Sequence, residues 1–249
     1  MSNAPAAAAA LDVLALLSRH TEALPAASIA TQLGLPRSST YHLLAVLQER
    51  GFVVHLPEER RYALGVAAYE LGSAYSRQAP LQRLARPLVA RLVDETHQNA
   101  HLAVLHGADV VYLLEERAPR RPPLVSDVGV RLPAHLTASG LALLAALPAA
   151  QVRALYPSGA GLVRRHGAGP TSLTALRSLL TGVRHRGYAV EDGTVTPSFS
   201  SVAAPALDRS GYPVAAVALT FEGDRVGEAE RAALAEAVKT AAAALSRRL

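Results

Sequence analysis

The sequence predicts an α+β protein with an N-terminal winged helix-turn-helix and a C-terminal α+β domain built on a largely antiparallel sheet. The first observation is the order helix, turn, helix and hairpin within residues 24–65. The second is a series of strand pairs joined by short turns, with helices between them, in the rest of the chain. The third is the length of 249 residues, which suits one small and one medium domain. We therefore expect domains at 1–65 and 81–249, joined by a linker helix at 66–80.

The first helices are marked by apolar residues at helical spacing. The leading helix carries Leu11, Leu14 and Leu17. A short second helix carries Ile29, Ala30 and Leu33, and it is expected to stop at Gly34. Pro36 can open the next helix, because a proline lacks only an N–H that would be unpaired at a helix start. Two helices should therefore meet at a tight turn.

The third predicted helix, residues 37–50, has two distinct faces. Its buried stripe is Thr40, Leu43, Leu44 and Leu47. Its outer face is Ser38, Tyr41, His42, Ala45 and Glu49. Short polar groups of this kind suit a helix in a DNA major groove, where they can reach base edges. The solvated face of an ordinary helix pair explains this helix equally well when it is taken alone.

A predicted hairpin follows at once and favours DNA binding. Gly51 ends the helix, residues 52–55 and 60–64 alternate as strands, and residues 57–59 form the turn. Arg60 and Arg61 then lie at or just past the hairpin tip, where they could contact phosphates or a minor groove. A solvent-exposed hairpin is the alternative. The predicted DNA contacts are Arg37, Ser38, Ser39, Tyr41, His42, Arg60 and Arg61.

The net charge does not by itself point to nucleic acid. The formal charge of the chain is +5, but residues 1–80 contain six arginines, no lysine and six acidic residues. The whole excess therefore lies in the C-terminal part. DNA binding would depend on the local placement of Arg37, Arg60 and Arg61 rather than on a strongly positive field.

The C-terminal part alternates helices and strands. After a connecting helix at 66–76, Pro80 marks the boundary of the second domain. Helices are predicted at 81–96, 137–147, 173–186 and 228–248. Strands are predicted at 101–106, 110–116, 202–207 and 214–221, with short turns at 107–109 and 208–211.

Composition excludes several classes of protein. The chain has no cysteine, so it can hold no disulfide, no thiolate metal site and no cysteine nucleophile. No apolar run reaches the length of a membrane span, and the alanine-rich opening lacks the basic start and cleavage pattern of a signal peptide. We expect a soluble, cytoplasmic protein that needs no cofactor and has no membrane partner.

The motifs of common enzymes are missing from the sequence. There is no dinucleotide-binding glycine pattern, no phosphate-binding loop and no nucleophile elbow around Ser139. His97 and His101 are four residues apart, but they straddle a helix end and a strand start, which favours capping or core roles over a shared metal ion.

Two pairs of adjacent acids are candidates for a paired acid–base site. Glu115 and Glu116 adjoin on a strand and should point to opposite faces. Glu191 and Asp192 adjoin in a predicted loop, where they could share a ligand or simply form a solvated turn. The sequence thus predicts no catalytic residue and no metal ligand.

Several segments carry the pattern of one known family, in the same order. They are LGLPRSSTYHLLAVLQERGFV, RYALG, HLAVLHGADVVYLLE, VGVRLPAHLTASGLALLAALP, RGYAVEDGTVTPSFSSVAAPALDRSG and VAAVALTF. Through them the chain resembles the IclR family of bacterial transcriptional regulators over nearly its whole length. The resemblance implies a winged helix, a linking helix and an effector-binding domain similar to GAF or PAS folds, assembled as dimers or dimers of dimers.

The resemblance also implies where an effector would bind. Family pockets use the start of the helix after the His-x-Thr-Ala segment and an acid after the Gly-Tyr segment. The predicted effector-binding residues are Ala138, Ser139, Glu191, Ser201 and Thr220. A helix N-terminus suits an anion, so a small carboxylate is the expected ligand.

This chain departs from the family at several of these places. Ser201 stands where many relatives have Cys, and Ala218 and Thr220 stand where they have paired serines. Other departures are Leu141 for a frequent Lys, and Thr194 and Ser198 for Glu and Gly. They leave the identity of the ligand open.

The predicted function is sequence-specific regulation of transcription, with operator DNA, a small-molecule effector and further copies of the chain as partners. One alternative is a small-molecule enzyme or sensor with an incidental helix-turn-helix. Another is a regulator with a winged helix but a different effector domain.

Overall fold

The structure is a computed structural model, and it describes residues 4–78, 80–121, 126–159 and 161–249. The chain divides into two compact units, residues 1–79 and residues 80–249. Residue 79, within the expected linker at 66–80, lies outside the described residues. Each unit is described by itself.

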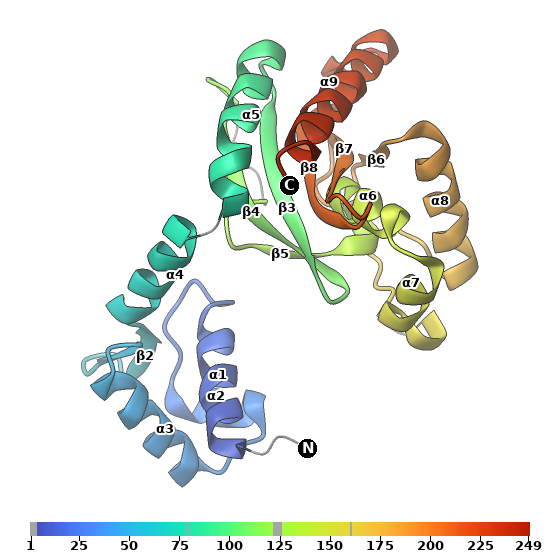
Figure 1. Cartoon of the computed structure of the whole chain (residues 1–249). Coiled ribbons are helices and arrows are strands. Elements are labelled where there is room, and N and C mark those ends of the chain that lie inside the picture. Colours follow the sequence, from blue (N-terminus) through green and yellow to red (C-terminus); the bar gives the residue numbers. More distant parts are fainter. Residues whose placement is uncertain (1–3, 79, 122–125, 160) are drawn as a thin grey trace. The chain divides into compact units, whose positions relative to one another are not determined.

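The N-terminal unit is a winged helix-turn-helix (Figure 1). Its helices are α1 (Pro5–Leu17), α2 (Ala26–Leu33), α3 (Arg37–Glu49) and α4 (Val66–Gln78). Gly34 ends α2 with a left-handed φ of 64°, which allows the chain to turn tightly before Pro36 and α3. Val13, Ile29 and Leu44, from three different helices, form the centre of the core.

The wing consists of β1 (Val53–Leu56) and β2 (Arg61–Leu64), which pair antiparallel. Leu24 adds a third partner, because its N–H and C=O both bond the backbone of Tyr62. Gly65 lies against the carbonyl of Gly51, where a side-chain Cβ would come within 2.2 Å of the oxygen. The wing is therefore fixed at its base to the helices.

The C-terminal unit is built on an antiparallel sheet. Among the described residues its strands are β3 (Asn99–His106), β4 (Asp109–Glu116), β5 (Arg131–Pro133), β6 (Ala189–Asp192), β7 (Phe199–Leu207) and β8 (Pro213–Glu222). Their order across the sheet is β5-β4-β3-β8-β7-β6. The predicted sheet type is therefore confirmed.

Helices cover both faces of this sheet (Figure 1). Helices α5 (Pro80–Thr96) and α9 (Glu228–Ser246) pack on one face through residues such as Val89, Val238 and Val217. Helices α6 (Ala138–Ala146), α7 (Ala149–Leu155) and α8 (Leu173–Arg186) lie on the other. Successive side chains along each strand point alternately into the two cores, as a sheet buried on both sides requires.

One predicted local structure is wrong. Glu191 and Asp192 were expected in a loop, but they end the short strand β6, which pairs with β7. As neighbours on a strand they point to opposite faces, so the strand does not bring their carboxylates together. Glu191 is buried, whereas Asp192 pairs with Arg231 at 2.9 Å. Within the described residues no helix is both long and apolar enough to cross a membrane.

Candidate functional site

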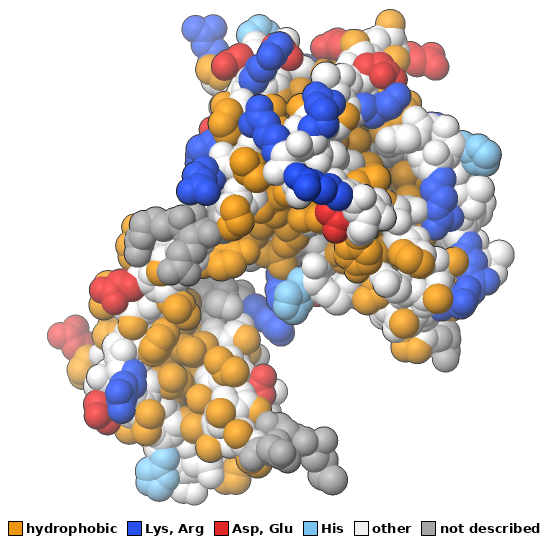
Figure 2. All heavy atoms as spheres, in the orientation of Figure 1, with side chains coloured by type: hydrophobic (Ala, Val, Ile, Leu, Met, Phe, Trp, Pro, Cys, Tyr) orange, Lys and Arg blue, Asp and Glu red, His pale blue; other side chains and the backbone are white. Residues whose placement is uncertain are grey.

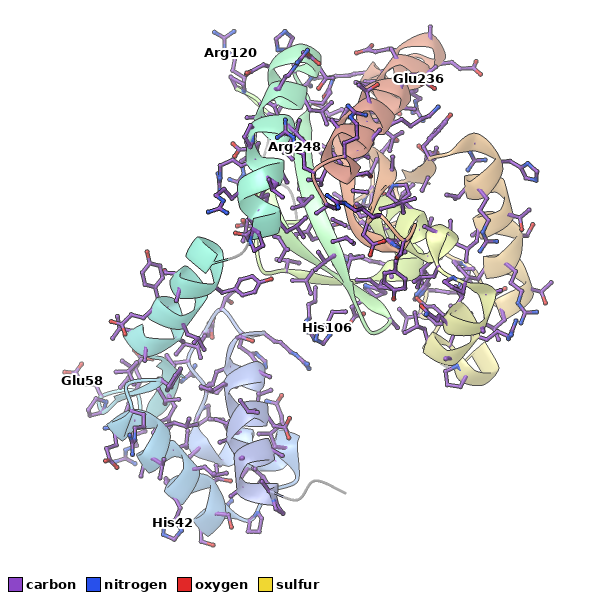
Figure 3. All side chains as sticks on the ribbon, viewed as in Figure 1. His42, Glu58, His106, Arg120, Glu236 and Arg248 are labelled. Atoms are coloured by element: carbon purple, nitrogen blue, oxygen red, sulfur yellow. The ribbon has the colours of Figure 1, made fainter. Side chains whose placement is uncertain are left out.

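The outer face of α3 is free for contact. Ser38, Tyr41 and His42 are exposed, with Tyr41 at 55 % exposure, while Thr40 on the inner face is buried and bonds the carbonyl of Pro36. Figure 3 shows His42 pointing away from the body of the N-terminal unit. Arg37 and Ser39 are exposed in the first turn of the same helix. The faces predicted for this helix are therefore confirmed.

The two arginines of the wing differ in their surroundings. Arg60 is exposed in the turn, with a left-handed φ of 53°. The Nη1 atom of Arg61 instead donates to the carbonyl of Ala23 at 3.1 Å and lies 3.7 Å from a carboxylate oxygen of Glu22. Arg60 is thus exposed in the turn, whereas Arg61 is engaged in holding the wing to the segment before α2.

The distribution of charged side chains on the surface agrees with the numbers of charged residues counted in the two parts of the sequence. Figure 2 shows Lys and Arg side chains over much of the visible face of the C-terminal unit and few on that of the N-terminal unit. The N-terminal unit therefore exerts little long-range attraction on a polyanion.

A narrow cavity of about 30 Å³ lies in the C-terminal unit, between the sheet and the start of α6. It is lined by His101, Tyr112, Ser126, Thr137, Ala138, Ser139, Glu191, Val195, Thr196, Phe199, Ser201, Ala218 and Thr220. All five residues predicted from the family pattern are in this set. The fold brings them together from one helix and three strands.

The floor of the cavity is a polar row across the sheet. Glu191 on β6 lies opposite Ser201 on β7, which lies opposite Thr220 on β8. The Ser201 and Thr220 hydroxyl oxygens are 3.0 Å apart. Because opposite residues of neighbouring strands point to the same face, the register alone aligns these groups.

Glu191 is held in place by the loop that follows β6. Its Oε1 atom accepts the N–H groups of Thr194 and Val195. Burial raises the pKa of the Glu191 carboxyl above its ordinary value, although these hydrogen bonds oppose the shift. Glu191 therefore shapes the wall of the cavity as well as lining it.

The opposite wall is the N-terminus of α6. Thr137 caps this helix, since its Oγ1 accepts the N–H of Gly140 at 2.9 Å. Within the described part of the chain, the N–H groups of Ala138 and Ser139 have no hydrogen-bond acceptor. Such groups, together with the helix dipole, favour an anion. Gly140 lets α6 pack closely, because a Cβ there would lie 2.1 Å from the carbonyl oxygen of Ala134.

Further polar residues that were not predicted line the cavity, among them His101, Tyr112 and Ser126. His101, only 1 % exposed, lies with Nε2 3.0 Å from Ser126 Oγ. Its ring meets the ring of Tyr112 edge-on, with centroids 5.5 Å apart. Burial raises the pKa of Tyr112 to about 12, although the side chains of Ser139 and Thr137 oppose the shift, so its hydroxyl stays protonated. A histidine in an otherwise apolar strand was the signal available in the sequence.

Glu115 lies behind His101. Its Oε1 atom is 3.8 Å from His101 Nε2, and its Oε2 atom is 2.8 Å from Arg117. Burial disfavours the Glu115 carboxylate, but hydrogen bonds and charges from His101 and Arg117 outweigh it and lower the pKa to about 2. Glu116 points to the other face and pairs with Arg86, as the alternation predicted.

His97 and His101 occupy different surroundings. His97 has a left-handed φ of 56° between α5 and β3, whereas His101 is in the core, one of the two roles expected for it. Over the described residues, no cluster of three or more His, Cys, Asp or Glu side chains is arranged to hold a metal ion.

The two units match two family models. Residues 6–57 match the IclR helix-turn-helix domain, and residues 73–247 match the bacterial transcriptional regulator IclR C-terminal domain. The chain is 31 % identical over 240 residues to the HTH-type transcriptional regulator XynR of Escherichia coli, covering 96 % of this chain and 95 % of the relative.

Solved structures agree with the sequence match. An IclR transcriptional regulator from Alicyclobacillus acidocaldarius superposes with a TM-score of 0.85 at 26 % identity, covering 99 % of both chains. An IclR homologue from Microbacterium hydrocarbonoxydans, solved in complex with 4-hydroxybenzoate, has a TM-score of 0.80 at 24 % identity, covering 97 % of this chain and 98 % of the other. The likeness to the second structure shows a shared fold.

Proposed function

Because the chain belongs to the IclR family of transcriptional regulators, we propose that it binds operator DNA through α3 and the wing under the control of a small carboxylate bound in the polar cavity. The observation that carries the effector proposal is the cavity itself. It places two free N–H groups of α6 above a row of hydroxyls and a buried carboxylate.

The polar groups of the cavity walls indicate which class of ligand would bind. The Ala138 and Ser139 N–H groups suit a carboxylate, and the Ser201 and Thr220 hydroxyls suit a second polar group. A pure hydrocarbon would leave the two N–H groups unpaired, at about 1–3 kcal/mol each. The ligand we propose is therefore a small carboxylic acid that also bears a hydroxyl or amino group. The homologue that holds 4-hydroxybenzoate binds an acid of this general kind.

The DNA contacts we propose are on α3 and the wing. Ser38, Ser39, Tyr41 and His42 would reach base edges and nearby phosphates, and Arg37 and Arg60 would contact phosphates. Arg61 would act mainly by positioning the wing. A unit with no net charge gains little affinity from one half-site, so we propose that two copies bind two half-sites together.

The remaining assignments follow from this role. We propose a DNA-binding part at 1–65, a linker helix at 66–80 and an effector-binding and self-association part at 81–249. We also propose that the protein has no enzymatic activity, in line with relatives named as regulators, and works in the cytoplasm, where bacterial operators lie.

The test uses the full chain and the DNA between its own coding sequence and the adjacent gene. Binding is measured by fluorescence anisotropy against a scrambled fragment of equal length. A panel of hydroxy, amino and aromatic carboxylic acids, including 4-hydroxybenzoate, is then added, each beside its carboxamide. We expect at least one acid, and not its amide, to change the affinity for the specific fragment. Equal binding to both DNA fragments would refute the DNA assignment.

The cavity is tested with variants of its walls. Glu191→Ala should abolish the response to the active acid while sparing DNA binding without ligand, because the two sites are in separate units. Ser201→Val should weaken ligand binding in calorimetry. Asp192→Ala is the matched control, since Asp192 adjoins Glu191 but points to the opposite face. Equal ligand affinity in all of these proteins would refute the cavity as the effector site.

A further inference from the structure

The cavity proposed to hold a carboxylate has no fixed positive charge in its lining. Among the described residues that line it, the titratable ones are His101, Tyr112 and Glu191, and none is Lys or Arg. Glu191 is itself acidic and buried. A carboxylate ligand would thus share a confined space with a second carboxyl group, and two like charges in such a space disfavour each other.

His101 lies next to the place where the ligand carboxylate would bind. Its ring contacts Tyr112, whose hydroxyl lies near the side chains of Ser139 and Thr137 at the start of α6. His101 and the free N–H groups of Ala138 and Ser139 line the same cavity. His101 is therefore the one side chain in the described lining that can become positive beside an anion bound at α6.

Arg117 and Glu115 form a chain of charged side chains that ends at His101. Arg117, which is 46 % exposed, lies 2.8 Å from Glu115, and Glu115 lies 3.8 Å from His101 Nε2. Arg117 also lies 3.7 Å from Asp127. Glu115 remains ionised at neutral pH because its pKa is lowered to about 2. A buried carboxylate on one side of an imidazole stabilises its cationic form.

We propose that the effector carboxylate binds together with one proton, which His101 takes up from solvent. In the complex the charges of neighbouring groups alternate: Arg117 is positive, Glu115 negative, His101 positive and the ligand negative. The inference rests on the proposed function, since it concerns the same cavity. It narrows the ligand class to acids whose ionised carboxylate, rather than a neutral isostere, is recognised.

The other groups around His101 do not replace it. On β4 the titratable neighbours are Tyr112 and Glu115, and on the segment after it Asp127 pairs with Arg117. On β8 the residue opposite is Ala218, and the start of α6 brings Thr137, Ala138 and Ser139, which do not titrate near neutral pH. Glu191 on β6 is the competing proton site, so the test must separate it from His101.

The experiment measures binding of the acid identified in the panel above by isothermal titration calorimetry of the full chain. Repeating the titration in buffers of different ionisation enthalpy gives the number of protons taken up. We expect about one proton per ligand when free His101 is neutral, and affinity that falls about tenfold per pH unit in that range. This measurement needs no variant, so it does not depend on how a variant folds.

Variants assign the proton to a residue. His101→Gln keeps a hydrogen-bonding side chain but should lose the proton uptake and flatten the pH dependence. His106→Gln is the matched control, because His106 is on the same strand but exposed at its end (Figure 3). Glu191→Gln should still take up about one proton per ligand bound, in titrations at acid concentrations high enough to saturate a weakened site. Glu115→Gln should shift the pH dependence of binding to lower pH, because the imidazolium loses its partner.

The outcomes are distinguishable. If no acid in the panel binds the wild-type protein, the proposed function and this inference both fail. If an acid binds and alters DNA affinity without proton uptake, only this inference fails. It also fails if His101→Gln still takes up a proton, or if Glu191→Gln binds the acid without proton uptake. Binding of the carboxamide with affinity equal to that of the acid would exclude the recognition of charge.

Discussion

The Oγ atom of Ser201 lies 3.0 Å from the Oγ1 atom of Thr220, and the two hydroxyls face each other across β7 and β8. Both are partly buried at the floor of the cavity. While no ligand is bound, the two hydroxyls hydrogen-bond with each other. Neither is then an unpaired polar group that would destabilise the folded state. Removing one hydroxyl and removing both should therefore have different effects.

Replacing both partners of this pair should cost less than the sum of the two single replacements. Thr220→Val or Ser201→Ala leaves one hydroxyl without its partner, and we expect each to lower the free energy of unfolding by about 1–3 kcal/mol. The double variant should cost less than the sum, because no hydroxyl then remains unpaired. Urea unfolding of the four proteins measures this coupling. Strict additivity would show that water already satisfies both groups.

Alanine substitutions on the outer face of α3 should affect DNA binding alone. Ser38→Ala, Tyr41→Ala and His42→Ala should each weaken specific binding by about 1–3 kcal/mol and leave the melting temperature nearly unchanged, because these side chains are exposed. Footprinting and thermal unfolding measure the two effects. Gln32→Ala, also exposed but on α2, is the control. An unaltered footprint in the triple variant would remove these residues from the interface.

The two wing arginines should differ in salt dependence. Arg60→Ala should reduce the slope of log affinity against log salt by roughly one unit, as loss of one phosphate contact requires. Arg61→Ala should lower the affinity with a smaller change of slope, because its guanidinium is engaged with Ala23. Anisotropy titrations at several salt concentrations compare them with Arg50→Ala. Equal slopes for Arg60→Ala and the wild type would mean that Arg60 contacts no phosphate.

Acid should remove the contribution of Glu115 to stability. Its pKa is lowered in the folded state from an ordinary 4.5 to about 2, so its stabilisation is present above about pH 4.5 and is lost as the pH falls toward 2. Glu115→Gln should cost about 1–3 kcal/mol at neutral pH and progressively less in acid. Glu116→Gln, in a more exposed pair with Arg86, should cost about 0–1 kcal/mol. A pH-independent difference for Glu115→Gln would contradict this account.

Two glycines in helices should respond oppositely to alanine. Gly140→Ala would place a Cβ 2.1 Å from the Ala134 carbonyl oxygen, so α6 must move and the C-terminal unit should be strongly destabilised. Gly72→Ala meets no atom within 4 Å in the middle of α4 and should stabilise by roughly 0.5–1 kcal/mol. Thermal unfolding distinguishes the two. A well-folded Gly140→Ala protein would mean that the approach of α6 to Ala134 can relax.

The N-terminal unit could be predicted almost completely from its residues. The faces of α3, the stop at Gly34 and the wing all follow from local rules of helix and turn formation. β6 could not, because a strand of four residues is held by its pairing with β7 rather than by its own sequence. Tertiary pairing of this kind leaves no local pattern.

The cavity was predicted in part. The family pattern supplied Ala138, Ser139 and Glu191, which come from elements far apart in the chain. The role of His101 could not be found in the same way, because it depends on the register that places Glu115 opposite it. Periodicity shows that His101 lies on a strand, but not which residues of other strands surround it.

The polar row on the floor of the cavity also restricts how the sheet can assemble. Glu191, Ser201 and Thr220 alternate with residues that face α5 and α9, among them Val202 and Leu219. If β7 shifted by one residue against β8, Ser201 would enter that apolar core and Val202 would face the cavity. Misaligned pairings of these strands are thus penalised during folding. A substitution that makes the row apolar, and so fits a different ligand, would weaken this penalty. A change of ligand preference at the cavity floor would therefore also make misaligned pairing of β7 and β8 less unfavourable.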